Sequence, residues 1–132
     1  MKKSINPTTL FDSRQFGFSQ IVTSPPGTMI FISGQVAWDE NGEIVGENNF
    51  KKQTQKVFEN LEIAMQSAGG SLDDIVMLRI YIVSYKEEYS AIVSESLLQY
   101  FNNDNPPAST WISVSGLAND KFMLEVEAQA IL

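Results

Sequence analysis

The last quarter of the chain, Pro106–Leu132, is predicted to form two strands whose polar side chains have the types and spacing needed for chemistry. One strand carries hydroxyls, including Ser109, and the other carries carboxylates at Glu125 and Glu127. Because successive side chains of a strand point to opposite faces, Glu125 and Glu127 share one face. We expect the two strands to be neighbours, so that the hydroxyl-rich face meets the acidic face.

The sequence has no cysteine and no histidine. This composition excludes disulfides, thiolate nucleophiles and Ser-His-Asp catalysis. It also excludes the usual zinc sites, which need thiolate or imidazole ligands. Acid–base chemistry near neutral pH would therefore have to use carboxylates, tyrosine, lysine or a positioned water.

Charge and length narrow the class of protein further. The formal net charge is −7, and the basic residues are scattered apart from Lys51, Lys52 and Lys56, so we do not expect nucleic-acid binding. No apolar run approaches the roughly 18 residues of a membrane span, and no export signal follows Lys2 and Lys3. We expect one domain over residues 1–132, in a cytoplasmic protein without a membrane segment.

Hydrophobic spacing and turn residues predict the order of the elements. Apolar residues at helical spacing indicate a helix that Asn49 caps and that ends before Gly69-Gly70. Ser84-x-x-Glu87 is a capping-box pattern that predicts a second helix. The predicted strands are Phe16–Thr23 and Thr28–Ser33, which form a hairpin, then Ile75–Val83, the strand with Ser109, and Phe122–Ile131, with Thr9–Phe11 as a further candidate edge strand.

The predicted order, β-β-α-β-α-β-β, indicates an α+β fold with two helices on one face of the sheet. Two helices leave the other face uncovered, and we expect Tyr81, Trp111 and Met123 to lie there. An exposed apolar face of this kind indicates a partner surface, and symmetric self-association is the commonest way to cover it.

Arg79 interrupts the otherwise apolar strand Ile75–Val83. Alternation places it with Tyr81 on the uncovered face. A buried charge needs a partner. Arg79 is therefore either one half of an interface salt bridge, with Glu125 or Glu127, or an anchor for a bound anion.

Several short motifs follow one another in an order and spacing that resemble the YjgF/RidA (endoribonuclease L-PSP-like) family. None of them is specific alone, but together they cover about residues 16–131. They are Gly17-Phe18-Ser19-Gln20, Ser33-Gly34-Gln35, Gln53-Thr54, Asn60-Leu61, Ala68-Gly69-Gly70, Pro107-Ala108 and Glu125-Val126-Glu127-Ala128.

The resemblance implies a chorismate-mutase-like fold that assembles as a homotrimer with a barrel-like centre and a cleft between neighbouring subunits. In the active deaminases of the family, an arginine in this cleft binds the substrate carboxylate and a glutamate of the last strand holds the attacking water. The products are a 2-keto acid and ammonia. The resemblance implies no metal and no organic cofactor.

The chain departs from the family pattern at the cleft. Ser109 stands where the activity depends on arginine, and Trp111 stands where active relatives often have cysteine. Phe18 keeps the ring of the family tyrosine without its hydroxyl, whereas Glu125 matches the water-holding glutamate. Gly34 leaves room for a ligand to approach the backbone. Each residue also has a plain structural role open to it, as a strand or turn residue or in interface packing.

These departures favour a family member with a remodelled intersubunit cleft, which binds or hydrolyses a small metabolite other than the usual iminoacids. With two acids and no arginine, such a cleft suits a neutral or cationic ligand better than a carboxylate. The alternatives are an enamine/imine deaminase that uses a Glu125-held water and a substitute anchor such as Arg79, and a non-catalytic regulatory trimer. The acidic charge and the lack of histidine speak against a ribonuclease.

Overall fold

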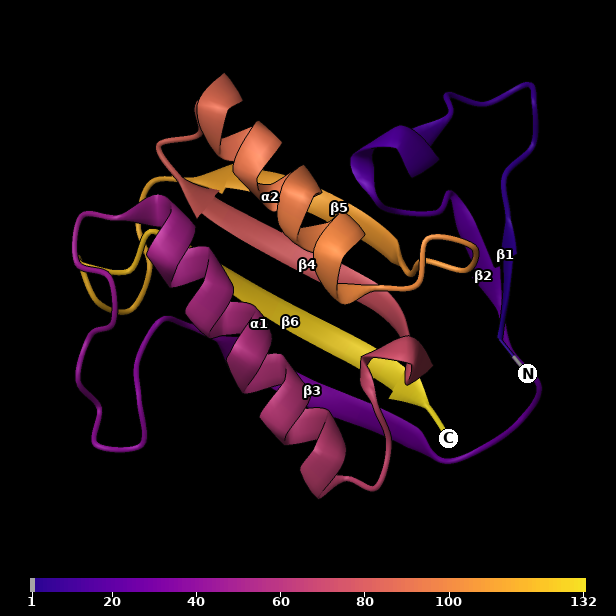
Figure 1. Ribbon diagram of the computed structural model, residues 1–132, viewed down its shortest axis with the longest axis horizontal. Coiled ribbons are helices and arrows are strands. Elements are labelled where there is room, and N and C mark those ends of the chain that lie inside the picture. The colour runs from indigo at the N-terminus through magenta and orange to yellow at the C-terminus, as the bar shows by residue number, and fades with distance from the viewer. Residues whose placement is uncertain (1) are drawn as a thin grey trace.

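The computed structural model describes residues 2–132 and contains a four-stranded sheet with both helices on one face (Figure 1). The strands lie in the order β3-β6-β4-β5, with β4 and β5 parallel and the other two pairs antiparallel. The predicted α+β class is confirmed. The elements of this layer are β3 (Met29–Gln35), α1 (Phe50–Ser67), β4 (Ile75–Val83), α2 (Glu87–Tyr100), β5 (Ala108–Val114) and β6 (Leu124–Ile131).

The core lies between the sheet and the helices, and alternation within the strands determines which side chains enter it. In β6, Leu124, Val126, Ala128 and Ala130 are buried against the helices, while the residues between them are half-buried on the opposite face. Three apolar side chains of that opposite face remain exposed. They are Met29 (58%), Phe31 (68%) and Ile112 (39%).

Helix α1 begins and ends where the sequence predicts. The Asn49 side chain accepts a hydrogen bond from the backbone N–H of Lys52 (3.0 Å), which satisfies one free donor of the first turn. After Ser67 the chain turns through Gly69, whose φ of +88° is readily adopted only by glycine. These end signals fix the helix that covers β3 and β6 (Figure 1).

The prediction for the N-terminal segment is wrong. Residues Ser13–Phe16 form the 3₁₀ helix η1, and only Ile21–Thr23 (β2) is a strand. It pairs with β1 (Lys3–Ile5) in a separate two-stranded sheet, so the predicted hairpin with β3 does not form and the candidate strand Thr9–Phe11 is a loop. The reason is a non-local contact, because the backbone N–H of Ser19 donates to the carbonyl of Pro107 and holds this segment beside the start of β5.

The final two strands are not neighbours, contrary to the prediction. Strand β4 lies between β5 and β6 and pairs with both of them. The chain passes from β4 through α2 to β5, a crossover that brings β5 back parallel to β4. The remaining edge of β4 is then filled by β6.

Element boundaries at α2 and β6 also differ from the prediction. The expected capping box at Ser84 does not form, since α2 begins after Lys86, which makes no side-chain cap, and Ser84 itself has a φ of +51°. Strand β6 begins at Leu124 rather than Phe122, whose buried ring packs edge-on against Trp38 instead.

Among residues 2–132 there is no helix both long and apolar enough to cross a bilayer.

Candidate functional site

A cavity of about 310 Å³ opens between η1, α2 and the edge strand β5. Most of its wall is aromatic, and the other described residues that line it are two serines. A volume of this size suits a small ligand. The residues that line it are Phe16, Phe18, Ser90, Ser109 and Trp111.

Ser109 and Trp111 enter this cavity because of the register between β4 and β5. Ser109 lies beside Leu78 and Trp111 beside Ile80, two residues of the buried core, so both point to the helix-covered face. The prediction that Trp111 lies on the uncovered face is therefore wrong. Alternation does place Ser109 and Trp111 on one side, as predicted, but only the pairing with β4 determines which side that is.

The aromatic corner of the cavity is held together by direct contacts. The indole N–H of Trp111 donates a hydrogen bond to Oγ of Ser109 (2.9 Å), and the ring of Phe18 lies 5.6 Å from that of Trp111 at an angle of 49°. Ser109 is thus bonded to Trp111 rather than being an unengaged strand serine. Its own O–H remains available as a single neutral donor.

Glu125 and Gly34 meet on the opposite face of the sheet. Ser33 and Gly34 together oppose one residue of β6, a bulge that brings the β3 backbone under the Glu125 side chain. A Cβ added at Gly34 would lie 2.2 Å from Oε2 of Glu125. Gly34 is therefore needed for the close approach of this carboxylate, and the predicted contact between its backbone and a ligand stays a prediction.

We expect Gly34→Ala to push the Glu125 carboxylate away from β3, because the new methyl would occupy its space. The loss of stability should be below about 1 kcal/mol, since the end of a flexible side chain can move. A crystal structure and urea unfolding of the variant would measure both effects. Gly116→Ala is the matched control, since nothing lies within 4 Å of its added Cβ. A Glu125 that stays in place would contradict the prediction.

Arg79 lies on the same uncovered face as Glu125 and is half-buried. Its register partner is Glu127, yet none of the ion pairs formed within residues 2–132 involves Arg79. Glu127 instead accepts a hydrogen bond from the Tyr81 hydroxyl, and this bond, together with burial, raises the pKa of Tyr81. No salt bridge between Arg79 and Glu125 or Glu127 forms inside the described chain, and the expected salt bridge at an interface between subunits stays a prediction.

The structure thus separates the predicted site residues into two groups. Phe18, Ser109 and Trp111 lie together on the helix side, whereas Gly34, Arg79 and Glu125 lie on the other side of the sheet. One chain cannot bring the two groups to one ligand.

Two residues of the cavity, Phe16 and Ser90, were missed by the sequence analysis. Phe16 was assigned to a strand, although it ends η1. Ser90 stands in the first turns of α2, where nothing in its sequence context distinguishes it from a solvated helix serine.

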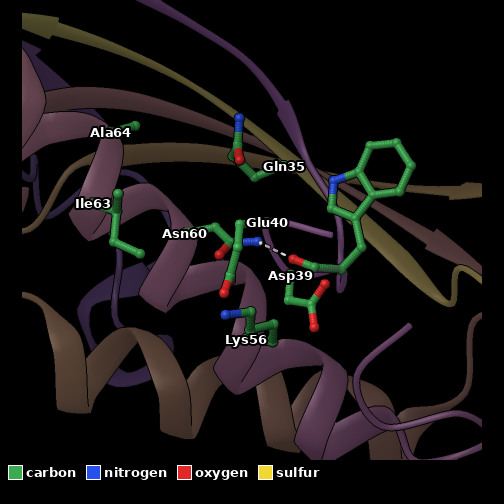
Figure 2. Close-up of a pocket in the computed structure, with 8 residues that line it drawn as sticks. Gln35, Asp39, Glu40, Lys56, Asn60, Ile63 and Ala64 are labelled. Carbon is green, nitrogen blue, oxygen red and sulfur yellow. Dashed lines mark hydrogen bonds between the residues drawn. The ribbon is translucent and has the colours of Figure 1, made fainter. Parts of the chain in front are cut away.

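A second hollow of about 300 Å³ lies between α1 and the loop after β3. Figure 2 shows residues that line it. None of the predicted site residues lines it. The side-chain amide of Asn60 donates to the carbonyls of Val36 and Trp38, and Asp39 accepts from two backbone N–H groups of its own turn. These polar groups hold the loop in place, so they are already engaged and we assign no ligand to this hollow.

Comparisons with known proteins show the family and the shared fold of this chain. The family model described as endoribonuclease L-PSP matches residues 13–132. A RutC family protein of Pyrococcus abyssi is 36% identical over 105 residues, 79% of each chain. The crystal structure of a Rid family protein of unknown function from Yersinia pestis, YyfB, has a TM-score of 0.96 at 37% identity and covers 99% of this chain and 98% of its own.

A more distant structure, RidA from an Antarctic Psychrobacter, has a TM-score of 0.71 at 25% identity and covers 98% of this chain and 94% of its own. The whole sheet with its two helices is therefore shared with Rid proteins. The chain belongs to the endoribonuclease L-PSP family, which is the YjgF/RidA family that its motifs resemble.

Proposed function

We propose that this protein is a Rid-type small-molecule protein whose remodelled cleft binds, or hydrolyses, a small metabolite other than the usual iminoacids. The observation that carries this proposal is the hydrogen bond from the Trp111 indole to Ser109. Ser109 is the residue that the motif resemblance aligns with the family arginine. The cavity beside it has aromatic walls and serine hydroxyls, and no lysine or arginine in the described chain lines it.

Energetics support the proposal. An arginine binds a carboxylate through two parallel charge-assisted hydrogen bonds, whereas Ser109 offers one neutral hydroxyl. Losing the charged hydrogen bonds costs about 2–3 kcal/mol, or roughly 30- to 100-fold in affinity. An iminoacid would thus lose its main anchor in this cleft.

A cleft shared between subunits would reunite the two groups of site residues. Within one chain Ser109 and Glu125 face opposite sides of the sheet, so a ligand that touches both needs two chains. The exposed side chains Met29, Phe31 and Ile112 on the uncovered face are suited to burial against another copy. The family resemblance favours three copies, and a carboxylate of a neighbouring subunit is a suitable partner for Arg79.

The deaminase remains the second candidate because the Glu125 carboxylate sits in a place made for it by Gly34. This glutamate is the residue that would hold the attacking water. A purely regulatory trimer is less well supported, since Trp111 lines an open cavity in the chain rather than filling it.

Freshly generated iminoacids distinguish the two candidates. We expect 2-iminopropanoate to release ammonia at the same rate with and without the purified protein. The reason is that the cavity has no arginine to bind the carboxylate of this substrate. Light scattering would establish the oligomeric state of the same sample. Rapid ammonia release that Glu125→Ala abolishes would replace the proposal with the deaminase, and a monomer at working concentration would remove the shared cleft.

A further inference from the structure

The lining of the cavity constrains the charge of the ligand that it can bind. This step rests on the proposed function and deepens it. The rings of Phe16, Phe18 and Trp111 make up most of the wall. The face of an aromatic ring is electrically negative, so it attracts cations and repels carboxylates.

The basic residues nearest in sequence to the cavity are engaged elsewhere. Arg14, two residues before Phe16, makes two hydrogen bonds to the carboxylate of Asp12 (2.8 and 3.0 Å). Lys86, one turn before Ser90, lies over the ring of Tyr89 and near Glu88 (3.9 Å). Neither side chain is therefore placed to neutralise an anion in the cavity.

Acidic residues line a neighbouring hollow instead. The neighbouring hollow along α2 shares Phe16 and Ser90 with the cavity, and Glu87 and Glu95 line it. The formal net charge of the chain is −7, so the chain as a whole also attracts cations. In the shared cleft proposed above, Glu125 of another subunit would contribute one more carboxylate.

We infer that the cavity formed by Phe16, Phe18, Ser90, Ser109 and Trp111 takes a small organic cation that lacks a carboxylate, such as a primary ammonium or an iminium ion. The rings stack on its apolar part and attract its charge. The hydroxyl oxygens of Ser90 and Ser109 have lone pairs that can accept hydrogen bonds from its N–H groups.

Two probes of similar size and opposite charge test this inference. Benzylammonium and benzoate share a phenyl ring, and benzyl alcohol serves as the neutral reference. We expect benzylammonium to bind about 10-fold more tightly than benzoate, as measured by titration calorimetry. Equal or tighter binding of benzoate, or no binding of benzylammonium at millimolar concentration, would overturn the inference.

Variants locate the binding. Phe16→Leu, which removes one ring but keeps an apolar side chain, should weaken benzylammonium several-fold and bring its affinity closer to that of benzyl alcohol. Trp38→Phe is the matched control, because Trp38 lines the other hollow and not this cavity. A Phe16→Leu variant that folds but keeps the full cation preference would place the probe elsewhere and refute the assignment.

Glu125→Gln separates this inference from the proposed function. In one outcome, the wild-type protein prefers the cation and Glu125→Gln leaves that preference unchanged. This result supports the aromatic cavity but contradicts a cleft shared with Glu125. A wild-type preference for benzoate, with binding still altered by Glu125→Gln, supports the shared cleft and refutes the cation.

Discussion

Gln53→Leu is expected to lower the free energy of unfolding by about 3–5 kcal/mol. Gln53 is fully buried in α1 and makes three hydrogen bonds to the backbone of two separate loops. Its amide donates to the carbonyls of Gly46 and Lys121, and its oxygen accepts the N–H of Met123. Leucine has a similar volume but would leave these backbone groups without partners.

Urea unfolding at a fixed protein concentration would measure this loss, because oligomerisation makes stability depend on concentration. Gln66→Leu is the matched control, since Gln66 lies on the exposed side of the same helix. Its effect should stay within about 0.5 kcal/mol. Equal shifts in the two variants would show that the bridge between the loops contributes nothing.

The same buried glutamine shows how far sequence patterns reach. Local signals predicted α1 correctly, because Asn49 and Gly69 act on the residues next to them. The strand Ile75–Val83 was also predicted with its observed ends, since a long apolar run between turns has few other interpretations. Gln53, however, was noted only as part of a family motif, and its bonds to residues 68 and 70 positions away have no local signature.

Pairings between distant strands could not be predicted in the same way. Alternation shows that Ser109 and Trp111 share a face, but the face itself depends on the pairing of Trp111 with Ile80. Phe16 belongs to a predicted strand, but in the structure it ends η1, which contacts α2, and the chain after it is held by the hydrogen bond from Ser19 to the carbonyl of Pro107. Non-local hydrogen bonds decide such cases, and a single sequence does not record them.

The candidate site shows the same division. The resemblance supplied the residue types, among them Glu125 and the missing arginine at Ser109, but it did not show that they lie on opposite faces of one sheet. The clearance that Gly34 gives to Glu125 depends on a bulge in β3, which the sequence did not indicate.

Under the proposed function, Ser109→Arg should create an anion site in the cavity. The guanidinium would enter the cavity from β5 and offer a planar pair of donors to a carboxylate. We expect pyruvate to bind about 30- to 100-fold more tightly to Ser109→Arg than to the wild-type protein. Titration calorimetry would measure the gain, and light scattering would show whether the variant keeps the wild-type assembly.

Two further variants show whether the gain comes from charge or only from a longer side chain. Ser109→Gln adds length and hydrogen-bond donors without charge and should gain little, while Ser109→Lys adds charge without the planar fork and should fall between. If Ser109→Gln and Ser109→Arg gain the same affinity for pyruvate, the gain comes from the longer side chain and not from its charge. If the Ser109→Arg variant folds and assembles like the wild-type protein but gains no affinity for pyruvate, position 109 does not face the ligand. That result would contradict the proposal of a remodelled cleft at its central residue.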